Sequence, residues 1–194
     1  RSRASFIADG FQIPERPPRV AAVRPSVRER IEPELASIWR AALSLGRLPE
    51  AAELPPETRE RLAAARVSTD RALALAMDGT FDRAQLQEAA AARRDDLLVH
   101  FALSLFPGAP RYTTLSRSVQ RDVKTFFRSH SAALEAAQRL LFSVGRPDTL
   151  QAAAEQAAAA GLGGIVRDTA FRFSASALPR LPAPLRVVVG CAEL

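Results

Sequence analysis

Apolar residues recur at helical spacing along most of the chain, and short stretches rich in proline or glycine separate these helical patterns. The first pattern starts at Ser26 and stops at Gly46, with one apolar face formed by Ile31, Leu35, Ile38, Ala42 and Leu45. Residues 82–106 contain neither proline nor glycine and end at Pro107-Gly108-Ala109-Pro110. This segment is predicted to form the longest helix.

Shorter helical patterns fill the rest of the chain. They are predicted over residues 57–66, from Ser68 or Thr69 to about Gly79, from Ser116 or Ser118 to about Arg128, from Ser129 or Ser131 to Gly145, over residues 147–160, and from Pro182 or Pro184 onwards. Residues 169–174 give the single predicted strand. The expected fold is all-α: an irregular multi-helix domain of about seven or eight helices, with at most one short strand.

The first 25 residues differ from the remainder. They contain Pro14, Pro17, Pro18 and Pro25 and little periodic apolar pattern, which is typical of an extended linker or arm. Residues 26–194 are then the helical domain. Because the chain starts at Arg1 without methionine and stops at Leu194 within an apolar helical pattern, we expect a fragment of a longer protein, truncated at its C-terminus.

Charge is distributed unevenly along the chain. The net charge is +6, and residues 107–146 carry seven basic and two acidic side chains, a local balance of +5. The apolar runs are much shorter than the roughly 20 residues that span a membrane. The chain has one cysteine, which cannot form an internal disulfide, so a reducing cytoplasm is the expected location.

A basic stripe is the strongest candidate site. Arg117, Arg121, Lys124 and Arg128 are spaced four, three and four residues apart, which places them on one side of a helix, while Val119, Val123, Phe126 and Phe127 occupy broadly the opposite side. With nearby Arg111, the stripe predicts contacts to DNA phosphates. The alternative is an ordinary solvated face. No set of base-reading side chains accompanies the stripe.

The other polar clusters favour structural roles. Adjacent helical residues point about 100° apart, so Asp95 and Asp96 do not face each other, and ion pairs involving Arg93 or Arg94 are predicted instead. His100 is predicted to lie at the edge of the core, the glycines at 161–164 to stop a helix, and Cys191 to pack. No catalytic, cofactor-binding or metal residue is predicted, although an unfamiliar active site at Arg93, Asp96 and His100 stays as a third hypothesis.

A series of short motifs occurs in a particular order along residues 26–194. They are Gly46-Arg47-Leu48-Pro49, Arg93 to Leu103, Leu115 to Phe127, Leu141-Phe142-Ser143 with Gly145, Ala177-Leu178, and Leu185 to Ala192. In this order the chain resembles the C-terminal helical region of methyltransferase-like proteins associated with bacterial DNA phosphorothioation. The residues that carry the resemblance most clearly are Arg93, Arg94, Asp96, Gly190 and Cys191.

The resemblance implies an S-adenosylmethionine-dependent methyltransferase domain upstream, because this segment has no glycine-rich loop between a strand and a helix. The chain departs from the pattern of that family at two places. It has Arg172-Phe173-Ser174 where family members have a Tyr-Val-His-like strand, and Val188-Val189 where they often have Tyr and Glu. The predicted function is a non-catalytic DNA-engaging or scaffolding region. The alternative is a structural helical module for dimerisation or for docking to other defence-system proteins.

Overall fold

The computed structural model describes residues 25–78, 81–167 and 170–193, and the chain divides into two units, residues 1–30 and 31–194. In the first unit the described part holds the single-turn helix α2 (Val27–Arg30). Ser26 and Glu29 cap it reciprocally: the Ser26 N–H donates to Glu29 Oε2 at 2.6 Å and the Glu29 N–H donates to Ser26 Oγ at 3.2 Å. The predicted arm at residues 1–25 lies outside the described residues except for Pro25.

The second unit is helical, as predicted. Its α-helices are α3 (Glu32–Leu45), α4 (Pro56–Ala64), α5 (Thr69–Met77), α6 (Arg83–Ser104), α7 (Arg117–Phe127), α8 (His130–Ser143), α9 (Pro147–Ala159) and α10 (Ala183–Ala192). Three 3₁₀ turns, η1 (Ala51–Glu53), η2 (Tyr112–Thr114) and η3 (Ala175–Arg180), connect them. The described residues thus contain eight helices of seven residues or more and one short sheet, which confirms the all-α class.

Serine and aspartate side chains begin several helices where the sequence predicted. Ser68, Ser116 and Ser129 each accept a hydrogen bond from the backbone N–H three residues later, and Asp82 caps α6 in the same way. The pattern that starts at Ser26 breaks at Ile31 instead of continuing. A proline ring inside a helix collides with the carbonyl four residues earlier, so Pro33 fits only within the first turn of a new helix, where it lies in α3.

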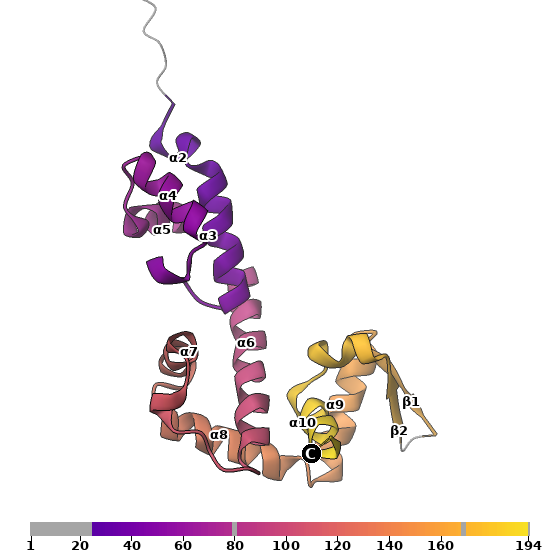
Figure 1. The fold of residues 1–194 in the computed structure, drawn as a ribbon. Coiled ribbons are helices and arrows are strands. Elements are labelled where there is room, and N and C mark those ends of the chain that lie inside the picture. The colour runs from indigo at the N-terminus through magenta and orange to yellow at the C-terminus, as the bar shows by residue number, and fades with distance from the viewer. Residues whose placement is uncertain (1–24, 79–80, 168–169, 194) are drawn as a thin grey trace, which may run out of the picture. The chain divides into compact units, whose positions relative to one another are not determined.

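Helix α6 is the element around which the second unit is built. Figure 1 shows α3 beside the first half of α6, with α4 and α5 on the other side of α3, and the second half of α6 contacts α8 and α10. Phe101 and Ala102 of α6 are fully buried, together with Val123, Ala133, Ala137 and Val187 from the later helices. A separate apolar cluster beside α3 contains the stacked rings of Trp39 and Phe81, with centroids 4.1 Å apart. In the described part of the chain, no helix combines the length and apolarity needed to cross a membrane.

The predicted strand over residues 169–174 is present as β2 (Ala170–Phe173), and Thr169 lies outside the described residues. It pairs antiparallel with β1 (Gly163–Val166), a segment that the sequence identified as a helix stop only. Gly163 lies opposite Phe173, and a Cβ at Gly163 would come within 2.4 Å of the Arg172 carbonyl oxygen and 2.6 Å of the Phe171 ring. Gly163 therefore permits the strand pairing, whereas Gly161, with φ of 68°, lies just after the end of α9.

Candidate nucleic-acid interface

Helix α7 separates an apolar side from a charged side, as its sequence predicted. Ser116 Oγ accepts a hydrogen bond from the Val119 N–H at 3.3 Å and so fixes the start of the helix. Val123 and Phe127 are buried in the core formed with α6 and α8. This burial holds α7 in place and leaves its opposite side to solvent.

One carboxylate of α7 is buried instead of exposed. Asp122 has no solvent-exposed surface, and its two oxygens accept hydrogen bonds from two arginines on different elements. Arg47 Nε donates to Oδ1 at 2.7 Å, while Arg93 Nε and Nη2 donate to Oδ2 at 3.0 and 2.8 Å. Because a buried charge is costly without partners, this pairing links α7 to the loop after α3 and to α6.

Glu53 completes the pairing of Arg47. Arg47 Nη1 and Nη2 donate to the two oxygens of Glu53 at 2.8 and 2.7 Å, a bidentate arrangement, and Ser118 Oγ of α7 donates to Glu53 Oε1 at 2.9 Å. The hydrogen bonds from Arg47 lower the pKa of Glu53 from 4.5 to about 2. The same hydrogen bonds raise the pKa of Arg47 above its ordinary value. Both side chains therefore stay ionised at neutral pH.

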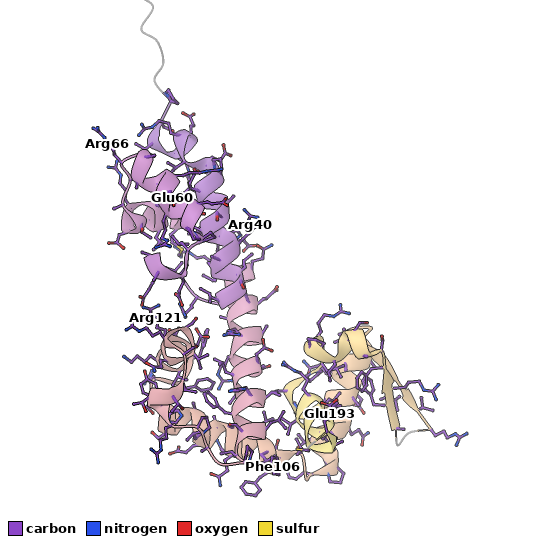
Figure 2. The ribbon with its side chains drawn as sticks, in the orientation of Figure 1. Arg40, Glu60, Arg66, Phe106, Arg121 and Glu193 are labelled. Atoms are coloured by element: carbon purple, nitrogen blue, oxygen red, sulfur yellow. The ribbon has the colours of Figure 1, made fainter. Side chains whose placement is uncertain are left out.

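Arg121 is paired with carboxylates, in contrast to the free basic stripe that the sequence suggested. It forms ion pairs with Glu50, which lies next to η1, and with Glu53 at 3.6 Å. We call Arg47, Glu50, Glu53, Arg93, Arg121 and Asp122 the α7 ion cluster. It contains three positive and three negative side chains, so the charge of Arg121 is balanced within the cluster. In Figure 2, Arg121 lies on the side of α7 that faces the α3–α4 connection.

The other four predicted cations have no ion-pair partner among the described residues. Arg111, Arg117, Lys124 and Arg128 are exposed, and in the described ranges no carboxylate lies within ion-pair distance of any of them. We call these four side chains the 111–128 cations. Arg128 follows the last residue of α7, with φ of 66°, so it lies beyond the helical stripe.

The turn η2, which follows Arg111, is attached to α7 by hydrogen bonds. Gln120 Nε2 donates to the carbonyl oxygens of Tyr112 and Leu115, at 3.1 and 2.9 Å. The Tyr112 hydroxyl donates in return to the Gln120 carbonyl oxygen at 3.4 Å. Arg111 immediately precedes this turn, so its backbone is held close to the helix that carries the other cations.

The charged run in α6 contacts neighbouring elements, and these contacts include the ion pair that the sequence predicted for Arg93. Arg93 pairs with Asp122, the Arg94 guanidinium lies 5.3 Å from the centroid of the Phe127 ring, and Asp96 pairs with Arg186 of α10 at 2.7 Å. Burial raises the pKa of the neighbouring Asp95. These side chains are paired to different elements, so Arg93 and Asp96 do not form one hydrogen-bonded site with His100.

The two stretches that carry the resemblance most clearly lie against each other. Arg186 of α10 reaches Asp96 of α6, and a Cβ at Gly190 would come within 2.4 Å of a Leu103 methyl group. Cys191 is half-buried and packs against the core. The positions of Gly190 and Cys191 are thus explained by helix packing between α10 and α6, without assigning chemistry to either residue.

The two histidines occupy different environments. His100 is exposed, so the prediction that it lies at the core edge is wrong; its ring is tilted against Phe101 at 5.5 Å. His130 lies between the rings of Phe101 and Tyr112, at 5.9 and 5.7 Å, and its Nε2 is buried without a hydrogen-bond partner. Among the residues that the structure describes, no three His, Cys, Asp or Glu side chains gather as a metal site would require.

Sequence reasoning missed Arg47, Glu53 and Asp122, the centre of the α7 ion cluster. One local signal was available: Asp122 lies four residues before Phe126, on the edge of the apolar side of α7. A carboxylate at such a position needs a buried partner. Nothing local identified the partner, because Arg47 is 75 residues away in the chain.

Comparison with known proteins adds no further identification. No protein-family description, curated protein or solved structure matches this chain.

Proposed function

We propose that this chain is a non-catalytic, DNA-engaging region of a methyltransferase-like protein associated with DNA phosphorothioation, and that the 111–128 cations contact the phosphate backbone. In this proposal the S-adenosylmethionine site belongs to an upstream domain. The observation that carries the DNA contact is the exposure of four cations that have no carboxylate partner among the described residues. The family assignment rests on the order of the sequence motifs.

The α7 ion cluster supports the proposal in two ways. It neutralises the carboxylates nearest to the charged side of α7, so they do not oppose an approaching phosphate. It also holds α7 through buried contacts to the loop after α3 and to α6, which fixes the cations before DNA binds. Phosphate contacts of this kind give affinity without base readout.

The test is a fluorescence-anisotropy titration of duplex DNA, plain and phosphorothioated, over a series of salt concentrations. Four phosphate contacts predict that wild-type affinity falls on the order of a hundredfold between 50 and 200 mM salt, since each contact contributes about 0.9 to the logarithmic slope. The variant carries glutamine at Arg111, Arg117, Lys124 and Arg128. We expect it to lose most of the affinity and the salt dependence. Tighter binding of the phosphorothioated duplex would indicate recognition of the sulfur.

A matched control removes the same charge elsewhere. Arg40, Arg59, Arg66 and Arg71 are exposed on α3, α4, α5 and the loop between α4 and α5, and glutamine at these four positions lowers the net charge equally. The control is expected to bind DNA nearly as well as the wild type at 100 mM salt. If both variants lose affinity equally, binding follows total charge and the proposed interface is wrong. Absence of wild-type binding at low salt removes the DNA part of the proposal.

A further inference from the structure

An open apolar groove lies in the C-terminal part of the second unit and contains none of the 111–128 cations in its lining. It has a volume of about 830 Å³ and is lined by α9, both strands and α10, through side chains that include Leu150, Ile165, Phe171, Phe173, Leu185 and Val188. This volume is in the range of pockets that hold a bound group. Ile165 and Val188 remain 42% and 38% exposed, so within the described structure no element covers the groove.

The groove also carries one charge. Glu155 of α9 is the single charged residue among its lining residues, and the contact that it makes is a hydrogen bond accepted from Gln151 Nε2 at 3.0 Å. No cation of the described ranges forms an ion pair with it. A complementary occupant therefore presents an apolar group together with one positive charge.

The chain itself presents such a surface beside the groove. Phe142, near the C-terminus of α8, is 70% exposed and lies two residues before Val144, the first residue of the groove lining. Arg139 is three residues earlier in α8, on the same side of the helix, exposed and without an ion-pair partner among the residues described. A large exposed aromatic side chain with an adjacent cation is complementary to the apolar lining of the groove and to the charge of Glu155.

We propose that a second copy of this chain fills the groove, in a symmetric dimer. Phe142 of each copy inserts between α9, the hairpin and α10 of the other, and Arg139 of each pairs with Glu155 of the other. In a twofold dimer the same patch serves both copies, so it must contain the protrusion and the cavity together. Residues 139–189 of this chain contain both. The proposal does not depend on DNA binding, and it is tested without DNA.

The first experiment measures mass by sedimentation velocity and light scattering over a range of protein concentrations. We expect the wild type to dimerise, and Phe142→Ser to weaken the dimer at least about tenfold, since buried aromatic anchors dominate such interfaces. The control is Phe106→Ser, at a phenylalanine that is 57% exposed at the end of α6 and does not line the groove. It is expected to leave the dimer intact, and circular dichroism checks that both variants fold.

A charge exchange tests the pairing itself. Glu155→Arg and Arg139→Glu each place like charges together and should each weaken the dimer, while the double variant should restore it. A wild type that stays monomeric up to roughly 100 µM, well above the working range of a specific interface, overturns the proposal. So does a dimer that Phe142→Ser leaves unchanged, and failure of the double variant to restore association overturns the Arg139–Glu155 pairing.

Discussion

Asp122→Asn is the most informative single change in this chain. The substitution keeps the size of the side chain but replaces a buried carboxylate by a neutral amide. The amide oxygen can still accept from one arginine, whereas the amide nitrogen then faces the donors of the other. The variant therefore buries the positive charges of Arg47 and Arg93 with less compensation.

The magnitude follows from how each arginine is placed. Removing one partner of a buried ion pair typically costs about 3–5 kcal/mol. Arg47 keeps its bidentate contact with Glu53, and the Arg93 side chain is 30% exposed and gains access to water. Both facts reduce the cost, so we expect a loss of about 3 kcal/mol, or roughly 6–12 °C in Tm for a domain of this size.

Urea unfolding followed by circular dichroism at 222 nm measures this loss. Asp70→Asn is the matched control, because Asp70 is exposed and makes no ion pair within the described ranges; its effect should stay within about 0.5 kcal/mol. The double variant Arg93→Gln with Asp122→Asn should cost less than the sum of the two single changes, since both remove the same contact. If Asp122→Asn costs less than about 1 kcal/mol, the cluster does not hold α7 as described.

Three further changes test the surroundings of the cluster by the same unfolding method. Gly46 has φ of 63°, and a Cβ there would lie 2.7 Å from the Ala89 carbonyl oxygen. Gly46→Ala should therefore cost at least about 2 kcal/mol of stability. Its control, Gly164→Ala, should be nearly neutral because no heavy atom lies within 4 Å of a Cβ at Gly164. Because the pKa of Glu53 is lowered from 4.5 to about 2, its ionised form contributes stability that is complete above pH 4.5 and is lost as the pH falls towards 2. With allowance for screening by solvent, Glu53→Gln should cost about 1–2 kcal/mol at pH 7 and progressively less below pH 4.5. Burial raises the pKa of Asp95, so its ionised form opposes folding as the pH rises; Asp95→Asn should raise Tm slightly at pH 7 and leave it unchanged near pH 3.

The helices were predictable because their signals are local. Ser116 and Ser129 lie immediately before their helices and cap them, and Gly46 ends α3 in the left-handed conformation that glycine tolerates. Each signal acts within one turn of the chain, so a single sequence contains it in full. The β1 strand was not predicted because its two glycines have low strand propensity. In the structure, pairing with Phe171 and Phe173 of β2 outweighs this low propensity.

The candidate site was only partly predictable, because its ion pairs join distant segments. The spacing of Arg117, Arg121 and Lys124 correctly placed them on one side of α7, but it could not show that Glu50 approaches Arg121. That approach depends on how the loop after α3 packs against α6, where Gly46 meets the backbone at Ala89. The geometry of this contact is absent from any local pattern.

Local pairing is a better guide than net charge to where an anion would bind. The segment 107–146 has a net charge of +5. Of its charged side chains, Arg121 and Asp122 belong to the α7 ion cluster, and because their charges are opposite, the other side chains of the segment still sum to +5. Arg47 and Arg93, which lie outside this segment, supply the positive charges that neutralise Asp122. The positive excess therefore remains on side chains that are free to reach solvent, and the buried carboxylate fixes the helix without weakening the field of the 111–128 cations.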